Sequence, residues 1–232
     1  MSREALDYLK TRFRAAVDDK DIDPTDQSGL LWSDLDVLDY INIAHEEFVR
    51  DTRYKRGVVP LTVVAGDPVV VVPESIIEPR YEQATLVNHG VTVCERNINE
   101  AMVVDDYGQR ATTNLFMNGS PGVPRVYTFD HTSGELRLYP TPTMDDELLL
   151  PAYLEASEVC DFNDSLDIRK QRHIRMLLAG MMREAYLKQD ADVYSPDQAA
   201  RYAAMFESSK QQTKAEITRR TRTPGQIVYG GL

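Results

Sequence analysis

Alternating carboxylates near the N-terminus have the spacing in this chain that most resembles a metal site. Asp19, Asp21 and Asp23 occupy every second position, as the first ligands of a calcium-binding loop do. A loop of that kind beginning at Asp19 needs a glycine and a bidentate glutamate where this chain has Pro24 and Leu30. We therefore interpret the segment as a solvated acidic loop.

The histidines give no stronger indication of chemistry. The triplet His45-Glu46-Glu47 begins like the zinc-binding helix of metalloproteases, but Val49 stands where the second histidine belongs. The remaining histidines are scattered along the chain: His89, His131 and His173. The sequence contains no nucleophile elbow and no glycine-rich phosphate loop. It thus predicts no enzyme, no bound metal and no cofactor.

The composition is typical of a globular protein with a strong negative charge. The chain has 232 residues, of which 42% are hydrophobic and 27% charged, and a formal net charge of −11. That charge argues against wrapping nucleic acid, which requires clustered Lys and Arg. No apolar run approaches the roughly 20 residues of a membrane helix, and no secretory signal is evident. We expect synthesis and use in a cytoplasm, with Cys94 and Cys160 reduced.

The charges are unevenly distributed along the sequence. Between Asp18 and Glu47, Lys20 is the only basic residue among ten acidic ones. Between Lys210 and Arg222 the balance is reversed, and Glu216 is the only acidic residue. Two solvated faces are one interpretation. The other is a subunit whose two ends are complementary in charge and suited to head-to-tail contacts.

Two amphipathic segments in the N-terminal quarter predict helices. The first begins after Ser2. The second runs from Asp34 to about Arg56, with Ser33 as its N-cap and Gly57 as its end.

Two further helices are predicted in the C-terminal third. The third follows a cap region at 163–165 and carries apolar residues at helical spacing from 174 to 186. The fourth has the strongest start signal, because Ser195 at the N-cap, Pro196 and Gln198 fit a capping box.

The residues from about 58 to 157 predict β structure. Segment 65–68 suggests a hairpin-like connection between the first two strands, and Pro151 suggests an edge or a bulge in the last one. The expected strands are 61–64, 69–72, 83–87, 91–95, 125–129, 135–139 and 148–155.

The order of these elements predicts an α+β chain. Antiparallel packing of both helix pairs would bury their apolar stripes in a four-helix bundle built from the N- and C-terminal segments, with a central β-rich insertion. The expected domains are 1–57 with 160–221 for the bundle, 58–159 for the β-rich insertion, and 222–232 for an extended C-terminal arm.

Two motifs carry a family resemblance. Trp32-Ser-Asp, followed by Leu38-Asp-Tyr-Ile-Asn, opens the second helix, and Leu136-Arg-Leu-Tyr-Pro-Thr-Pro closes a glycine-turned hairpin. With the two later helices, this order resembles the head–tail adaptor (head-completion, or connector) proteins of tailed bacteriophages, a group that includes tail tubular protein A of short-tailed phages.

The resemblance implies a structural virion protein and not an enzyme. Such a chain forms a ring, typically of a dozen copies, that docks below the portal, extends the DNA channel and provides the platform for tail attachment. The implied partners are the portal protein, a tail or tail-nozzle protein and further copies of the chain. DNA would pass through the lumen without sequence-specific binding, and no membrane is involved. The implied location is the neck of the virion, after assembly in the host cytoplasm.

Two sets of contact residues are expected within this scheme. We assign portal binding to the glycine-flanked apolar end of the chain, for which a disordered tail is the alternative; its residues are Gln226, Ile227, Val228, Tyr229 and Leu232. We assign tail-side or intersubunit contacts to the hairpin region, with Arg125, Tyr127, His131 and Tyr139. The alternative function is a β-domain binding module that recognises a glycan or a host surface protein.

Overall fold

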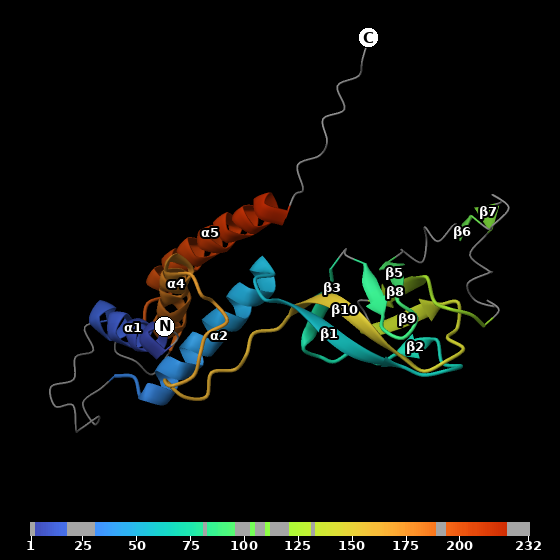
Figure 1. Cartoon of the computed structure of the whole chain (residues 1–232). Helices are drawn as coiled ribbons and strands as arrows, with labels where there is room; N and C mark the ends of the chain where they lie inside the picture. Colours follow the sequence, from blue (N-terminus) through green and yellow to red (C-terminus); the bar gives the residue numbers. More distant parts are fainter. Residues whose placement is uncertain are drawn as a thin grey trace, which may run out of the picture. The chain divides into compact units, whose positions relative to one another are not determined.

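The computed structural model describes residues 3–17, 31–80, 83–95, 103–104, 110–111, 121–130, 133–188 and 194–221. The chain divides into two compact units (Figure 1). A helical unit combines Met1–Lys55 with Glu155–Leu232, and a β unit comprises Arg56–Leu154. The α+β class expected from the sequence is confirmed.

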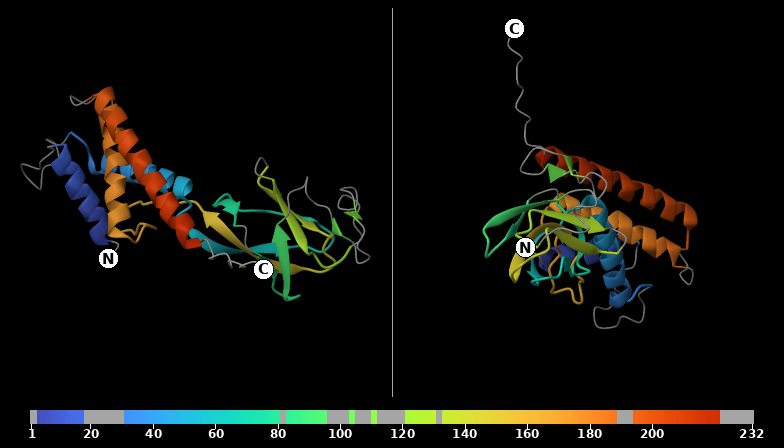
Figure 2. Two further views of the ribbon diagram at one scale, coloured as in Figure 1. Left: turned by 90° about the horizontal axis from the view of Figure 1, so that it is seen from above. Right: turned by 90° about the vertical axis from the view of Figure 1, so that its right-hand side faces the viewer.

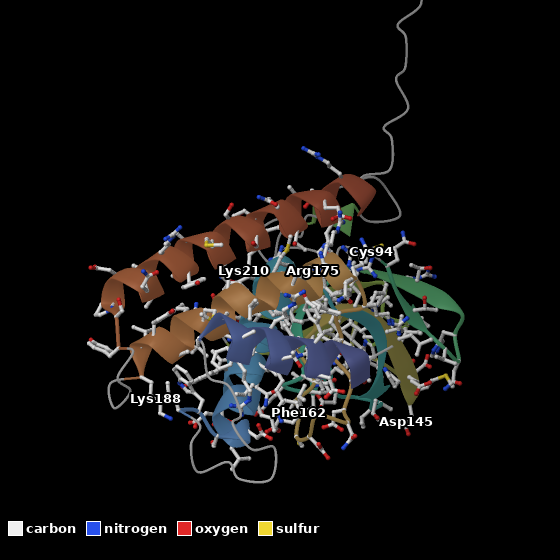
Figure 3. The ribbon with its side chains drawn as sticks, turned by 90° about the vertical axis from the view of Figure 1, so that its left-hand side faces the viewer. Cys94, Asp145, Phe162, Arg175, Lys188 and Lys210 are labelled. Atoms are coloured by element: carbon white, nitrogen blue, oxygen red, sulfur yellow. The ribbon has the colours of Figure 1, made fainter. Side chains whose placement is uncertain are left out.

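The helical unit is organised around α4. Its helices are α1 (Arg3–Ala16), α2 (Asp34–Thr52), α4 (Gln171–Leu187) and α5 (Pro196–Thr221). α4 packs against each of the other three helices. Figure 3 shows α5, α4 and α1 side by side with α2 running across them, and Figure 2 shows α4 along α5. Among the described helices, none combines the length and the hydrophobicity needed to cross a membrane.

The antiparallel four-helix bundle expected from the sequence is not supported. A bundle buries one stripe of each helix, whereas α4 buries residues around much of its circumference. Gly180 explains how two neighbours approach α4 so closely. A Cβ atom built on Gly180 would lie 2.8 Å from the Cβ of Ala44 in α2 and 3.2 Å from ring carbons of Phe206 in α5. The missing side chain therefore allows α2 to cross α4 instead of lying along it.

The helix ends correct two further expectations. α2 stops at Thr52, because Arg53 adopts a left-handed conformation with φ 53°, so Gly57 does not end it. Segment 163–165 does not cap α4, which begins after Lys170. Instead Asp164 accepts the backbone N–H groups of Cys160 and Asp161.

The start of α5 agrees with the sequence-based prediction. Pro196 is its first residue, and the Ser195 hydroxyl accepts the backbone N–H of Gln198 at 3.4 Å.

The β unit is built on one eight-stranded sheet in the order β1-β10-β4-β5-β8-β9-β2, with β3 also paired to β10. All pairs are antiparallel except β5 with β8. The two end strands approach each other, so the sheet curls almost closed around an apolar core. The strands are β1 (Arg56–Val63), β2 (Val69–Val70), β3 (Ile76–Pro79), β4 (Ala84–Leu86), β5 (Val91–Glu95), β8 (Val126–Asp130), β9 (Glu135–Tyr139) and β10 (Asp146–Leu154), with β6 (Val103–Val104) and β7 (Arg110–Ala111) in a separate small sheet.

Two strand pairs form hairpins with a glycine in the turn, and the hairpin-like connection predicted at 65–68 is wrong. β4 pairs with β5 through a turn at Gly90, and β8 pairs with β9 through a turn at Gly134, both glycines having positive φ. β1 and β2 do not form a hairpin, because β1 pairs with β10 and β2 pairs with β9. Pro151 lies inside β10 between the residues that pair with β4 and those that pair with β3, where a ladder N–H is not needed.

Candidate assembly interface

The start of α2 is tied to α1 by an ionic cluster. Asp34, the first residue of α2, accepts hydrogen bonds from Lys10 at 2.6 Å and from Arg14 at 2.7 Å. Partial burial alone would raise the pKa of Asp34, but the two cations outweigh it and hold that pKa below its usual value. The cluster therefore holds the N-terminal end of α2 against α1.

A capping box also stabilises the start of α2, through residues that are local in the sequence. The Ser33 hydroxyl accepts the backbone N–H of Asp36 at 3.1 Å, and the Asp36 carboxylate accepts the backbone N–H of Ser33 at 2.9 Å. Lys188, at the end of α4, donates to the other oxygen of Asp36 at 2.8 Å. The predicted N-cap is therefore confirmed, and it also joins α2 to α4.

Trp32 is a core residue and not a surface contact. Its side chain is fully buried, and its ring meets that of Phe13 edge-on, with 5.6 Å between the ring centroids. The tryptophan of the family motif thus anchors the segment before α2 against α1.

Lys210 links α5 to α2 from within the helical unit. Its side chain is 6% exposed, and its ammonium nitrogen lies 2.5 Å from Glu47, 2.8 Å from Glu207 and within hydrogen-bond reach of Asp51. Burial acts to lower the pKa of Lys210, but the three carboxylates outweigh it and raise that pKa. Arg183 of α4 donates to the other oxygen of Glu47 at 2.7 Å, so three helices meet at this cluster.

The same carboxylates have the spacing of a metal site. Oxygen atoms of Glu47, Asp51 and Glu207 lie within 4.8 Å of one another. The ammonium group of Lys210 contacts all three, so it already neutralises the position that a cation would occupy. We interpret this cluster as a structural link between helices.

A surface depression in the helical unit forms an acidic groove. It has a volume of about 380 Å³ and lies between the outer face of α2 and the extended segment that follows β10. Arg50 in this groove pairs with Glu46 at 2.5 Å and with Glu155 at 3.3 Å, whereas Glu158 is exposed. The acidic groove is lined by Asn42, Glu46, Arg50, Glu155, Ala156, Ser157 and Glu158.

Hydrogen bonds hold the wall of the acidic groove against α2. The Asn42 side chain donates to the carbonyl of Val159 and accepts its N–H, both at 2.9 Å. Asp167 accepts the backbone N–H of Ser157 at 2.7 Å and pairs with Lys55 at 3.2 Å. The groove is therefore a fixed feature of the subunit surface, as an assembly contact requires.

His45 is buried behind this wall. Its Nε2 atom lies 3.8 Å from Asp167, too far for a hydrogen bond. Burial lowers the pKa of His45 to about 4, although Asp167 opposes the shift. His45 is therefore neutral at pH 7.

The structure separates the predicted tail-side residues by burial. Of the three predicted contact residues that the structure describes, only Arg125 is exposed to solvent. Tyr127 is fully buried and donates its hydroxyl to Glu95 at 3.3 Å, and Tyr139 is also buried. His131 lies outside the described residues.

The predicted portal-binding residues also lie outside the described residues, which end at 221. Their role stays a prediction. Sequence reasoning missed the acidic groove, because its two walls come from segments far apart in the chain. It assigned Lys210 to a charged run, whereas the structure buries that residue.

No curated protein matches the chain. One protein family, described as SU10 adaptor protein, matches residues 5–228, which span the helical unit and the β unit. Its members are bacteriophage head–tail adaptors. The chain therefore belongs to the SU10 adaptor protein family, and it is a structural protein of a bacteriophage.

Proposed function

We propose that this chain forms a ring, of a dozen copies, between the portal and the tail of the virion. The ring extends the DNA channel and provides the platform for tail attachment. The family match over residues 5–228 carries this proposal, because it covers both units and not an isolated motif. The rigid helical unit supplies lateral surfaces that can repeat around an axis.

The charge of the chain supports its use as a conduit. The net charge of −11 favours repulsion of DNA over retention, so DNA can slide past the subunits. No base recognition is needed for that task. The proposed partners are the portal protein, a tail or tail-nozzle protein and copies of the chain itself.

Virion imaging tests this function directly. A small epitope tag on the chain, followed by antibody labelling and electron microscopy, should mark the neck between capsid and tail. Particles that lack the chain should package DNA and fail to join tails. Label on the tail tip or the capsid shell, or normal tail joining without the chain, would contradict the proposal.

The C-terminal residues are proposed to bind the portal. Removal of residues 226–232 should abolish binding to portal-bearing particles without changing the thermal unfolding of the subunit, because the described core ends before them. A full-length variant in which serine replaces Ile227, Val228 and Tyr229 should also lose binding, which shows that the apolar side chains and not the chain length are needed. Retention of binding in both variants would rule out this arm as the grip.

The β unit is proposed to face the tail, with the β8–β9 hairpin as a contact element. Charged substitutions at its turn, next to Gly134, should block tail joining and leave portal binding unchanged. Loss of portal binding together with tail joining would contradict the separation of the two roles.

A further inference from the structure

A basic patch interrupts the acidic surface where the start of α4 lies beside the end of α5. Glu216 of α5 accepts a hydrogen bond from Lys170 at 2.9 Å and also pairs with Arg172. Arg175 is one turn after Arg172 on the same face of α4, and Figure 3 shows it where α4 and α5 lie side by side. The basic patch consists of Arg169, Lys170, Arg172, Arg175 and Arg219.

The basic patch has more positive charge than its single carboxylate neutralises. Arg169, Arg175 and Arg219 are exposed, and none of them forms an ion pair with another residue that the structure describes. Glu216 is shared by Lys170 and Arg172. In a chain with a net charge of −11, such an excess at one place is a candidate docking surface.

The acidic groove on α2 carries the opposite excess. Glu158 is exposed and has no ion-pair partner among the described residues, and Asp39 extends the same face of α2 one turn before Asn42. Among the described residues that line the groove, Arg50 is the only cation, and it already pairs with Glu46 and Glu155. The volume of about 380 Å³ is sufficient to receive long basic side chains.

Arg175 of the basic patch and the acidic groove lie on opposite sides of the crossing between α2 and α4. Ala44 faces Gly180 at the crossing of α2 with α4. With 3.6 residues per turn, Asn42 and Glu46 lie about 160° around α2 from Ala44. By the same geometry, Arg175 lies about 140° around α4 from Gly180. Arg175 and the groove face of α2 therefore point away from each other and cannot pair within one subunit.

We propose that the basic patch of one copy docks into the acidic groove of the next copy. This inference rests on the proposed self-assembly and names the surfaces that make the contact. Complementary charges on opposite sides of a rigid unit produce a head-to-tail contact, and such contacts close into a ring when the rotation between copies allows it. Asp39 and Glu158 receive Arg175 and Arg219 of the neighbouring copy.

A second copy fits the basic patch better than DNA does. Phosphate backbones need a continuous row of cations, whereas this patch is short and has a carboxylate, Glu216, at its centre. The same chain also offers a groove of opposite charge, so one gene supplies both partners.

Charge reversal of each surface tests the contact. The first variant combines Arg175→Glu with Arg219→Glu, and the second combines Asp39→Lys with Glu158→Lys. Sedimentation velocity of the isolated full chain, over rising concentration and at low salt, measures self-association. Each variant alone should associate at least tenfold more weakly than the wild type, since like charges then face each other.

The decisive samples are the two combinations. An equimolar mixture of the two variants should associate again, because each surface then meets its opposite, and so should the chain that carries all four substitutions. A chain with Arg12→Glu and Lys214→Glu is the matched control. It has the same net charge as the first variant, its two sites are exposed, and Lys214 lies about 140° around α5 from Arg219. This control should associate as the wild type does.

Several results would overturn the inference. The wild type could stay monomeric at millimolar concentration. The two variants could self-associate as strongly as the wild type. The equimolar mixture of the variants could fail to regain self-association. If the wild type binds duplex DNA, and the first variant loses that binding but self-associates normally, the basic patch binds phosphate and not a second copy. Because the assay omits the portal, these results are independent of portal docking. Suppose that the wild type binds portal-bearing particles normally and that the charge-reversed variants self-associate as strongly as it does. The proposed function would then stand, and only this inference would fail.

Discussion

The ammonium nitrogen of Lys210 lies 2.5 Å from a carboxylate oxygen of Glu47, joining α5 to α2 across 163 positions of sequence. Lys210 also lies over the ring of Phe206, 5.2 Å from its centroid. One buried cation therefore links α5 to α2 within the helical unit.

Replacement of Lys210 by methionine should destabilise the helical unit by about 2 kcal/mol, because three carboxylates would then lose the cation that they share, and only Glu47 would keep a second one, Arg183. Chemical denaturation followed by circular dichroism measures the change. Lys214→Met, at an exposed position of the same helix, should change stability by less than about 0.5 kcal/mol. Equal losses in the two variants would show that Lys210 contributes no more than a surface lysine.

Gly180→Ala should destabilise the chain by roughly 1 to 3 kcal/mol, although alanine is the better helix former. The added methyl group would lie 2.8 Å from the Cβ of Ala44, and the helices would have to separate. Ala44→Gly in the same chain should recover part of the loss, which a double-mutant cycle measures. A neutral Gly180→Ala substitution would mean that the crossing of α2 and α4 is not tightly packed.

Stability should fall as the pH is lowered from about 6.5 towards 4. Burial holds the pKa of His45 at about 4 in the folded chain, so the unfolded chain binds a proton first and is favoured over this range. The expected slope from His45 is at most about 1.4 kcal/mol per pH unit. A His45→Leu chain should show a shallower slope between pH 6.5 and 5, whatever its stability at pH 7.

Below that range the carboxylates add to the loss. The pKa values of Asp34, Asp36 and Glu47 are lowered in the folded chain, despite the opposing effect of burial, by their cationic partners. Their stabilising contribution is present above the unfolded pKa and is lost as the pH falls through the folded value. An unchanged slope between pH 6.5 and 5 in His45→Leu would show that His45 is not the group that makes stability depend on pH in that range.

Substitutions at Tyr127 and Arg125 should distinguish a residue that packs in the core of the β unit from one that contacts the tail. Tyr127→Ala should cost about 3 to 5 kcal/mol, because the ring is fully buried in the core of the sheet. Arg125→Glu should leave stability unchanged and reduce tail joining, since the side chain is exposed. Thermal unfolding and a tail-joining assay on the same two proteins provide the measurements. Normal tail joining with Arg125→Glu would remove this residue from the predicted contact set.

Local signals in the sequence were sufficient for individual elements. Ser33 and Ser195 identify the starts of two helices because a cap depends only on residues within one turn. The hairpins at Gly90 and Gly134 follow from turn chemistry, which is equally local.

The arrangement of the elements depends on distant partners and was not predictable in the same way. The hairpin expected between β1 and β2 is wrong because β1 finds a better partner in β10, where Leu61 lies opposite Leu148. The central position of α4 depends on Gly180 meeting Ala44, a contact that neither helix encodes alone. The acidic groove has the same origin, since its walls meet only in the folded subunit.

The division of the chain has a consequence for its biosynthesis. The β unit is one continuous segment, Arg56–Leu154, whereas the helical unit needs residues from both ends of the sequence. On the ribosome, α1 and α2 emerge first and must wait for α4 before their apolar sides are covered. The β unit is thus able to mature while the helices are still incomplete. The basic patch proposed for self-association is complete only after α5 has been synthesised, which delays premature joining of nascent chains.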